Sequence, residues 1–277
     1  MGVFYCSGNQ HLLYSNEGEA LMEQEQLTER VSREKVWHNQ KKSRQTQQKF
    51  YGDIVGRMWN DHKECMSKLL SNENTVLLDY GCGSGNDLIE LSDKIKKGIG
   101  IDISEALIDN AKLSIKEKGI KNIEFFVMDV MNTTFEDETF SLIRGSAILH
   151  HLDLKVGLNE IKRILKVGGE AIFFEPLGMN PAIALYRKLT PEARTVDERP
   201  FTKKDINQIK EIFPNVKIRY YSFFTLFSVP FKKFKLFSKI LFIMDFIDKI
   251  ALSKYSPLKY MAWICLIESK KQARQST

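Results

Sequence analysis

A glycine-rich turn between an apolar run and a helical stretch is the feature that most constrains this chain. Residues 76–85 read VLLDYGCGSG, so Gly81, Gly83 and Gly85 follow the pattern of a buried strand. Glycines allow positive φ and a close approach of the backbone to a ligand, and the helix that follows offers free N–H groups to an anion. The spacing is GxGxG, and Asn86 stands where the dinucleotide fingerprint GxGxxG needs glycine. The turn predicts a small-ligand site and counts against NAD or FAD.

Short β-rich runs alternate with helical stretches across residues 75–176. Such alternation predicts right-handed βαβ units and a parallel sheet, with the ligand beyond the carboxyl ends of the strands. We predict strands at residues 75–80, 98–101, 123–128, 140–143 and 170–175, and helices at residues 86–96, 105–118 and 155–165, the last of which ends at Gly168 and Gly169.

Two acidic residues end the second and third predicted strands. Asp102 stands where a carboxylate can accept hydrogen bonds from both hydroxyls of a ribose. Asp129 stands where it can accept from an exocyclic adenine amine, while a nearby backbone N–H serves a ring nitrogen. Asp137 or a backbone group is the alternative to Asp129. Together with the glycine turn, these positions predict a nucleoside ligand with a small charged tail.

Five short motifs in this order resemble the class I S-adenosylmethionine-dependent methyltransferases, closest to their small-molecule, methyltransferase-11-like branch. The motifs are DYGCGSG at 79–85, GIDIS at 100–104, MDV at 128–130, GSAILHHL at 145–152 and LKVGG at 165–169. The resemblance covers roughly residues 75–176. It implies an α/β, Rossmann-like, seven-stranded and mostly parallel sheet with helices on both faces and an antiparallel last strand. It also implies S-adenosyl-L-methionine as the cofactor.

On this resemblance, the three glycines flank the methionine part of the cofactor, Asp102 the ribose and Asp129 the adenine. We expect Asp79 to orient the turn rather than touch the ligand, and Cys82 to be a small packing residue. The cofactor-binding residues that we expect are Asp79, Gly81, Cys82, Gly83, Gly85, Asp102, Ile103, Asp129, Val130 and Ser146.

The catalytic candidates are His150, His151, Glu175 and Tyr51. The histidines follow the fourth predicted strand, Glu175 ends the fifth, and Tyr51 lies on a predicted N-terminal helix. A general base is needed only where the acceptor carries a proton on the attacking atom. The alternative for the histidine pair is that one of them merely caps the next helix. No HxxxH spacing accompanies the pair, so we expect no metal.

The chain is expected to divide into an N-terminal helical lid at residues 1–72 and a methyltransferase domain at residues 73–277. Within the domain, residues 75–176 form the cofactor half and residues 177–260 select the acceptor. Thr202 is the predicted N-cap of a helix through Ile212. Two more strands are predicted at 216–224 and 261–268.

A helical insertion separates these last two strands. Residues 230–257 are apolar, aromatic and rich in lysine, with an apolar face at helical spacing. This helix either packs on the core as one wall of the acceptor pocket or lies in a membrane interface. In the second case, anionic headgroups would meet Lys232, Lys233, Lys235 and Lys239. Both alternatives favour an apolar acceptor or an apolar surface.

Composition narrows the class of protein further. The net charge of +6, from 41 basic and 35 acidic residues, is far below that of a nucleic-acid arm. Residues 144–147 read RGSA, not the Asn/Asp-Pro-Pro-aromatic motif of nucleic-acid methyltransferases, so we expect no nucleic-acid partner. The four cysteines are dispersed without a CxxC, and no signal peptide or 18-residue apolar run is visible, which favours a reduced, cytoplasmic chain, either free or peripheral at a membrane.

The sequence therefore favours methyl transfer from S-adenosyl-L-methionine to a small lipophilic acceptor. Isoprenoid, quinone-like, polyketide-like and glycolipid acceptors all remain open, as do the attacked atom and the oligomeric state. The alternative is a protein that binds S-adenosylmethionine without catalysis, such as a membrane-associated partner protein.

Overall fold

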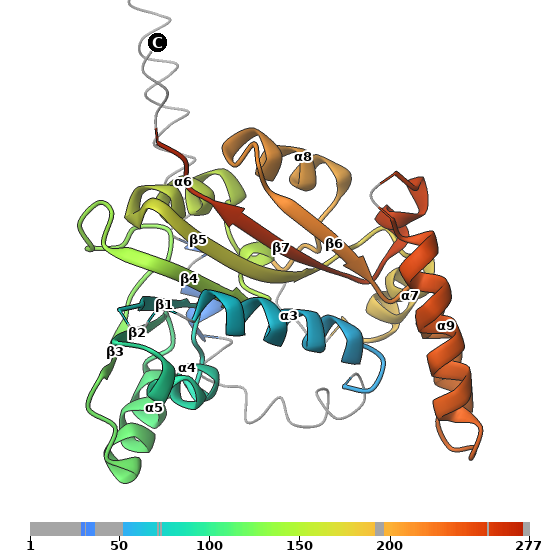
Figure 1. The fold of residues 1–277 in the computed structure, drawn as a ribbon, viewed down its shortest axis with the longest axis horizontal. Helices are drawn as coiled ribbons and strands as arrows, with labels where there is room; N and C mark the ends of the chain where they lie inside the picture. Colours follow the sequence, from blue (N-terminus) through green and yellow to red (C-terminus); the bar gives the residue numbers. More distant parts are fainter. Residues whose placement is uncertain are drawn as a thin grey trace, which may run out of the picture.

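The computed structural model describes residues 29–36 except 31, 52–70, 72, 74–191, 197–253 and 255–273. Its centre is a seven-stranded sheet in the order β3-β2-β1-β4-β5-β7-β6 (Figure 1). β7 runs antiparallel to β5 and β6, and the other neighbouring pairs are parallel. The predicted sheet is confirmed. The strands are β1 (Val76–Tyr80), β2 (Lys97–Asp102), β3 (Ile123–Val127), β4 (Phe140–Ser146), β5 (Leu165–Pro176), β6 (Lys217–Tyr221) and β7 (Ile264–Lys270).

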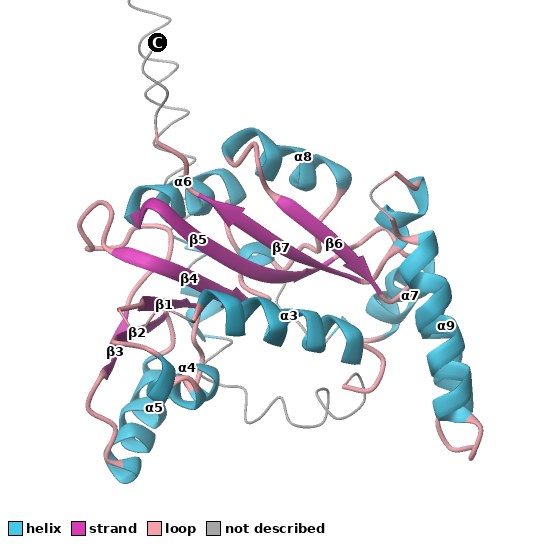
Figure 2. Cartoon of the chain, viewed as in Figure 1, coloured by secondary structure: helices cyan, strands magenta, loops and turns pink. Residues whose placement is uncertain are grey.

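Helices cover both faces of the sheet (Figure 2). α3 (Gly56–Leu69), α4 (Asn86–Glu90) and α5 (Glu105–Lys118) bury their apolar residues with those of one face. α6 (Leu154–Ile164) and α8 (Lys203–Ile212) do so on the other. The remaining elements are α7 (Pro181–Leu189), α9 (Phe237–Ala251) and the 3-10 helices η1 (Ser92–Lys94), η2 (Leu149–His151), η4 (Phe224–Phe231) and η5 (Pro257–Met261).

Local signals set many of these boundaries. The Ser104 hydroxyl accepts from the N–H of Leu107 at the start of α5, and Gly119 ends that helix with a φ of +67°. The Asp205 carboxylate accepts from the backbone N–H of Thr202 at 2.7 Å, which confirms Thr202 as the N-cap of α8. Side-chain oxygens that satisfy the first N–H groups, and a glycine in the left-handed region, are what a helix needs at its two ends.

Two sequence predictions need correction. Gly168 and Gly169 lie inside β5, because this strand begins at Leu165 directly after α6; Gly168, with a φ of +77°, lies where the register opposite β4 shifts, between Leu165 and Glu170. The helix predicted at 86–96 ends at Glu90 and continues only as the short η1. After β5, Pro181 opens α7, as the first helical position tolerates proline.

The predicted N-terminal lid has two described parts that behave differently. α3 packs Met58 and Met66 into the core cluster on one sheet face, together with Leu266 of β7. It therefore belongs to the layer that covers the sheet. The short helical stretch at residues 29–36, without residue 31, makes contacts at the edge of the sheet where the parallel strands end, which is called the ligand edge below. Among the helices that the structure describes, none combines the length and apolar character required to cross a membrane.

Candidate functional site

The glycine turn lies tight against the sheet and opens at one point. Gly81, Gly83 and Gly85 have φ values of 77°, 54° and 72°, in the left-handed region that favours glycine. A Cβ on Gly81 would lie 2.6 Å from the Ile148 side chain, and one on Gly85 would lie 2.3 Å from the Phe125 ring. A Cβ on Gly83 would meet nothing within 4 Å. The turn is thus wedged between two side chains and presents an open backbone edge at Gly83.

Asp102 and Asp129 flank this opening from the neighbouring strand ends. Asp102 ends β2, and its Oδ2 accepts from the Gly83 N–H at 2.8 Å while its Oδ1 accepts from the Ser104 N–H at 2.9 Å. Asp129 follows β3, and its Oδ1 accepts from the Met131 N–H at 2.8 Å. Each of these two carboxylates keeps lone pairs for further donors. Because β1, β2 and β3 are adjacent and parallel, the sheet brings the turn and both acids to one edge.

The other predicted cofactor residues hold this edge together. The Tyr80 hydroxyl donates to the carbonyl of Val130, which ties the loop after β3 to the end of β1. Ile103 is half-buried between Asp102 and Ser104. Burial raises the pKa of the Cys82 thiol well above its usual value, so the thiol stays protonated and serves as a packing group.

Arg144 is one residue at this site that the sequence analysis missed. It lies in β4 with 2% of its surface exposed and donates to Asp79 at 3.3 Å, to Asp87 at 2.6 Å and to the Ser146 hydroxyl at 3.1 Å. Asp79 precedes the glycine turn and Asp87 follows it, so one guanidinium joins both ends of the turn. Burial raises the pKa of Asp79 to about 6, against the opposing effect of Arg144. A basic residue inside an otherwise apolar strand was the signal available in the sequence.

Glu175 holds the loop that carries the histidine pair. It lies at the end of β5 with 0% exposure, and its Oε1 accepts from the N–H groups of Ile148 and Leu149 at 3.0 and 2.8 Å. Its Oε2 lies 2.7 Å from His150 Nδ1. With both carboxylate oxygens occupied by this loop, Glu175 fixes the position of His150, and the Nδ1 contact sets the imidazole orientation.

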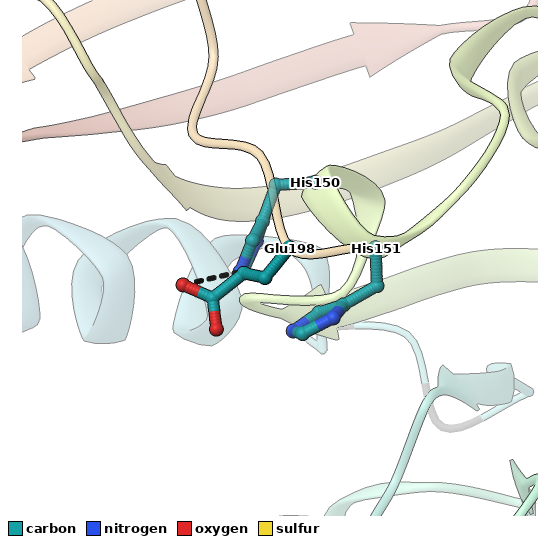
Figure 3. A group of neighbouring side chains, drawn as sticks. All are labelled: His150, His151 and Glu198. Atoms are coloured by element: carbon teal, nitrogen blue, oxygen red, sulfur yellow. Dashed lines mark ion pairs between the residues drawn. The ribbon is translucent and has the colours of Figure 1, made fainter. Parts of the chain in front are cut away.

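Two further carboxylates face the histidines. His150 Nε2 lies 3.9 Å from Glu198 Oε1 (Figure 3). The same Glu198 oxygen accepts from Arg187 at 2.7 Å. His151 Nδ1 lies 3.2 Å from Glu34 Oε2. Burial lowers the pKa of His151, which favours the neutral imidazole. Glu34 and Glu198 carried no sequence signal, because each lies far along the chain from the histidine it faces.

The histidine pair and Glu198 also form a group whose ligand atoms lie within 4.8 Å of one another. Two imidazoles and a carboxylate are donors that divalent cations accept. Two of the same groups are already engaged, however, since His150 faces Glu175 and Glu198 pairs with Arg187. The sequence-based expectation of no metal therefore stays a prediction, which metal analysis of the purified protein can test.

Residues 29–36, except 31, lie across the ligand edge. Lys35 pairs with Glu105 at the start of α5 at 2.7 Å, and Arg33 pairs with Asp197 at 2.9 Å. Together with the contact between Glu34 and His151, these pairs place the segment between the end of β2 and the loop after β4. Tyr51, the fourth catalytic candidate, lies outside the described residues.

The insertion between β6 and β7 is helical, as expected, and it supplies little of the core: Leu252, directly after α9, lies in the core cluster at 5% exposure. Phe227 and Phe234 are 58% and 63% exposed, and α9 buries only Asp248. Leu241, Met244 and Ile247 of α9 are half-buried, so both alternatives for this helix stay predictions.

A methyltransferase-domain family matches residues 77–169. Demethylmenaquinone methyltransferase of Lactococcus lactis is 34% identical over 116 residues, which are 40% of this chain and 45% of that protein. Aklanonic acid methyltransferase DauC of a Streptomyces species is 35% identical over 105 residues, 36% of this chain and 48% of that protein. The chain thus spans less than half the length of these curated relatives.

Among solved structures, geranyl diphosphate C-methyltransferase from Streptomyces coelicolor superposes with a TM-score of 0.55 at 14% identity, covering 78% of this chain and 80% of that one. That structure holds Mg²⁺, geranyl diphosphate and S-adenosyl-L-homocysteine. At this identity the likeness concerns the fold. The strand order, the glycine turn with its acidic neighbours and the domain match agree: residues 77–169 form a methyltransferase domain with the fold of the class I S-adenosylmethionine-dependent methyltransferases.

Proposed function

We propose that this protein transfers a methyl group from S-adenosyl-L-methionine to a small lipophilic acceptor. The observation that carries the proposal is the open backbone at Gly83 beside the carboxylates of Asp102 and Asp129, at one edge of the sheet. This edge fits a nucleoside with an amino-acid tail: Asp102 would bind the ribose hydroxyls, Asp129 the adenine amine, and the turn the methionine part. Asp79, Gly81, Cys82, Gly85, Ile103, Val130 and Ser146 complete the proposed binding site.

When bound, the cofactor supplies an electrophilic methyl group on a sulfonium. What the protein must add is alignment of the nucleophile with the S–CH3 bond and exclusion of water. We assign the exclusion of water to residues 29–36, whose ion pairs bridge the α5 start and the loop after β4. Hydrogen exchange in the N-terminal helical stretches should slow when the cofactor binds.

His150 is the group that we propose for proton removal where the acceptor is a hydroxyl or an ammonium. Glu175 faces His150 Nδ1 and so leaves Nε2 as the nitrogen that can accept a proton. Glu175 itself is a positioning residue, because the loop engages both of its oxygens. His151 would assist, and Tyr51 keeps its assignment as a further candidate.

Relatives support a lipophilic acceptor. Their names refer to demethylmenaquinone, aklanonic acid and geranyl diphosphate, which are a quinone, a polyketide and an isoprenoid. The insertion before β7 adds to this support, because its exposed phenylalanines offer apolar contact outside the cofactor half. We propose that residues 177–260 select the acceptor.

Calorimetry with S-adenosylmethionine and S-adenosylhomocysteine tests the cofactor part. The chain should bind both saturably, and Asp102→Ala should weaken binding by about 1–3 kcal/mol because the ribose loses its acceptor. Asp109→Ala is the matched control, since Asp109 is an exposed acid on α5, and it should leave affinity unchanged. Absence of binding by the wild-type chain would sink the proposal.

Transfer is tested separately from binding. Labelled methyl from the cofactor should appear in an apolar small-molecule fraction of a lipid extract incubated with the protein. Saturable cofactor binding with no label transferred to any fraction would favour the second candidate, a protein that binds S-adenosylmethionine without catalysis.

A further inference from the structure

α9 turns one stripe of apolar side chains to solvent. Phe242, Ile243, Phe246 and Ile250 are 76%, 53%, 59% and 63% exposed. At about 3.6 residues per turn, these positions form a single stripe along the helix. Figure 1 shows α9 at the β6 side of the molecule, projecting away from the sheet. Aromatic and branched residues in one exposed stripe are an unusual surface for a protein that stays in water, and they mark a contact site.

The acidic residues of the same helix point inward. Asp248 has 0% exposure and lies on the side of α9 opposite the stripe. Its carboxylate accepts from the N–H groups of Phe224 and Thr225 at 2.7 and 3.1 Å, at the start of η4. Asp245 pairs with Arg57 of α3 at 2.7 Å. Both carboxylates of the helix are thus used to attach it to the rest of the molecule.

The lysines around the stripe point outward. Lys233, Lys235, Lys239 and Lys249 are exposed, and no ion pair is recorded for them among the residues that the structure describes. Lys232, next to them, pairs with Asp53. The surface that α9 presents therefore combines bulky apolar side chains with uncompensated positive charge.

We propose that this face docks the protein on an anionic membrane surface. α9 would lie in the plane of the interface with Phe242, Phe246 and Ile250 among the upper acyl chains, while the lysines reach the headgroups. With 15 residues, α9 is about 22 Å long, which suits a helix lying in the interface and is too short to cross the bilayer.

Charge argues for a membrane rather than a second copy of this chain. A two-fold contact would place the stripe against its own copy and bring the exposed lysines of both copies together. The two acids that could neutralise them, Asp245 and Asp248, are already turned inward. An anionic lipid surface supplies the missing charge at every lysine.

Co-sedimentation of the full chain with lipid vesicles tests this proposal. The protein should bind vesicles of phosphatidylcholine with about a third phosphatidylserine at least about tenfold more tightly than vesicles of phosphatidylcholine alone. Binding should weaken as salt is raised from 0.05 to about 0.5 M, because screening shortens the reach of the lysines. Equal binding to both vesicles, or none to either, would overturn the proposal.

Two variants separate the apolar and the electrostatic contributions. Phe242→Ser with Phe246→Ser should reduce binding about tenfold or more by removing inserted area, and Lys235→Glu with Lys239→Glu should do the same by reversing charge. Leu113→Ser and Lys116→Glu on α5 are the matched controls, since Leu113 is 53% exposed and α5 lies across the molecule from α9 (Figure 1). Both controls should bind like the wild type.

Cofactor affinity provides the folding check, because the altered side chains are exposed and distant from the glycine turn. Wild-type vesicle binding by both altered chains would overturn the proposal. So would a dimer in sedimentation velocity that the phenylalanine variant dissociates, because the stripe would then belong to a contact between copies.

Discussion

Two regions of the molecule differ in which groups they bury: the half of the sheet formed by β1 to β4, and the projection formed by η4 and α9. In the first, Arg144 is buried between two carboxylates while the apolar residues of the strands fill the core. In α9, a carboxylate is the buried group, and Phe242 is 76% exposed. A helix with apolar residues and lysines can therefore be anchored by its acids and by one half-buried side, which leaves the exposed apolar stripe for a partner.

The two regions also differ in what their buried charge does. Arg144 shapes a binding edge, because it joins the residues on either side of the glycine turn. Asp248 joins two elements that form no part of that edge. Removing the charge of Arg144 should therefore disturb cofactor affinity, whereas removing that of Asp248 should disturb the attachment of α9.

The largest effect is expected from Arg144→Met. The free energy of unfolding should fall by about 3–5 kcal/mol, because the buried Asp79 carboxylate loses its partner. Cofactor affinity should fall as well, since the glycine turn is no longer held at both ends. Urea unfolding and calorimetry measure the two effects. Arg163→Met is the control: that side chain is 33% exposed, and water can replace its contacts, so about 1 kcal/mol is expected. Equal losses in both variants would contradict a special role for Arg144.

The next effect concerns pH. His62 of α3 is 7% exposed and packs edge-on against Trp59 and Phe174. Burial, with a contribution from Arg144, lowers its pKa to about 4. Between pH 6.5 and 4 the unfolded chain therefore binds the proton that the folded chain excludes, so stability falls as pH falls. At about 1.4 kcal/mol per unit, His62 should cost about 3 kcal/mol by pH 4.

Comparison of the wild type with His62→Gln in denaturant unfolding at pH 7 and pH 4.5 isolates this contribution. Asp79 acts in the opposite direction over the same range, because its raised pKa means that stability is lost as pH rises toward 6. The contribution of Asp79 to stability is the same in the wild type and in His62→Gln. The wild type should lose about 2–3 kcal/mol more than the variant between the two pH values. Parallel pH profiles would refute the assignment to His62.

The smallest of these effects is expected from Asp248→Ala. It should lower the free energy of unfolding by about 1–3 kcal/mol, since buried N–H groups at the start of η4 lose their acceptor. Hydrogen exchange within α9 should rise, while cofactor affinity stays unchanged. Asp245→Ala on the same helix is the control; its pair with Arg57 is partly exposed, so less than about 1 kcal/mol is expected. A loss of cofactor affinity in Asp248→Ala would show that the two regions are coupled.

Much of the fold and part of the candidate site were predictable from sequence. The strands of the sheet and the edge formed by Gly83, Asp102 and Asp129 follow from local pattern and from the rule that ligands bind beyond the strand ends. The link from Arg144 to Asp79 and Asp87 was not predictable. It joins residues 65 and 57 positions apart, and nothing local in the sequence specifies which buried charges meet.

For the loop that carries His150 and His151, too, one part of the arrangement is visible in the sequence and another part is not. That His150 and His151 follow the fourth strand is visible in the sequence, and so is the position of Glu175 at the end of the fifth. That Glu175 is occupied by the backbone of this loop, and that Glu34 and Glu198 face the histidines, depends on how four separate segments converge.

By itself, the sequence determined that α9 is an amphipathic helix with apolar residues and lysines, because periodicity is a local property of the chain. Only the tertiary structure decided which way that helix faces. The same periodic stripe results whether a helix is packed against a core or projects into solvent. The choice rests on where the helix is anchored: Asp248 holds the side opposite the stripe against η4, and Asp245 pairs with Arg57 of α3.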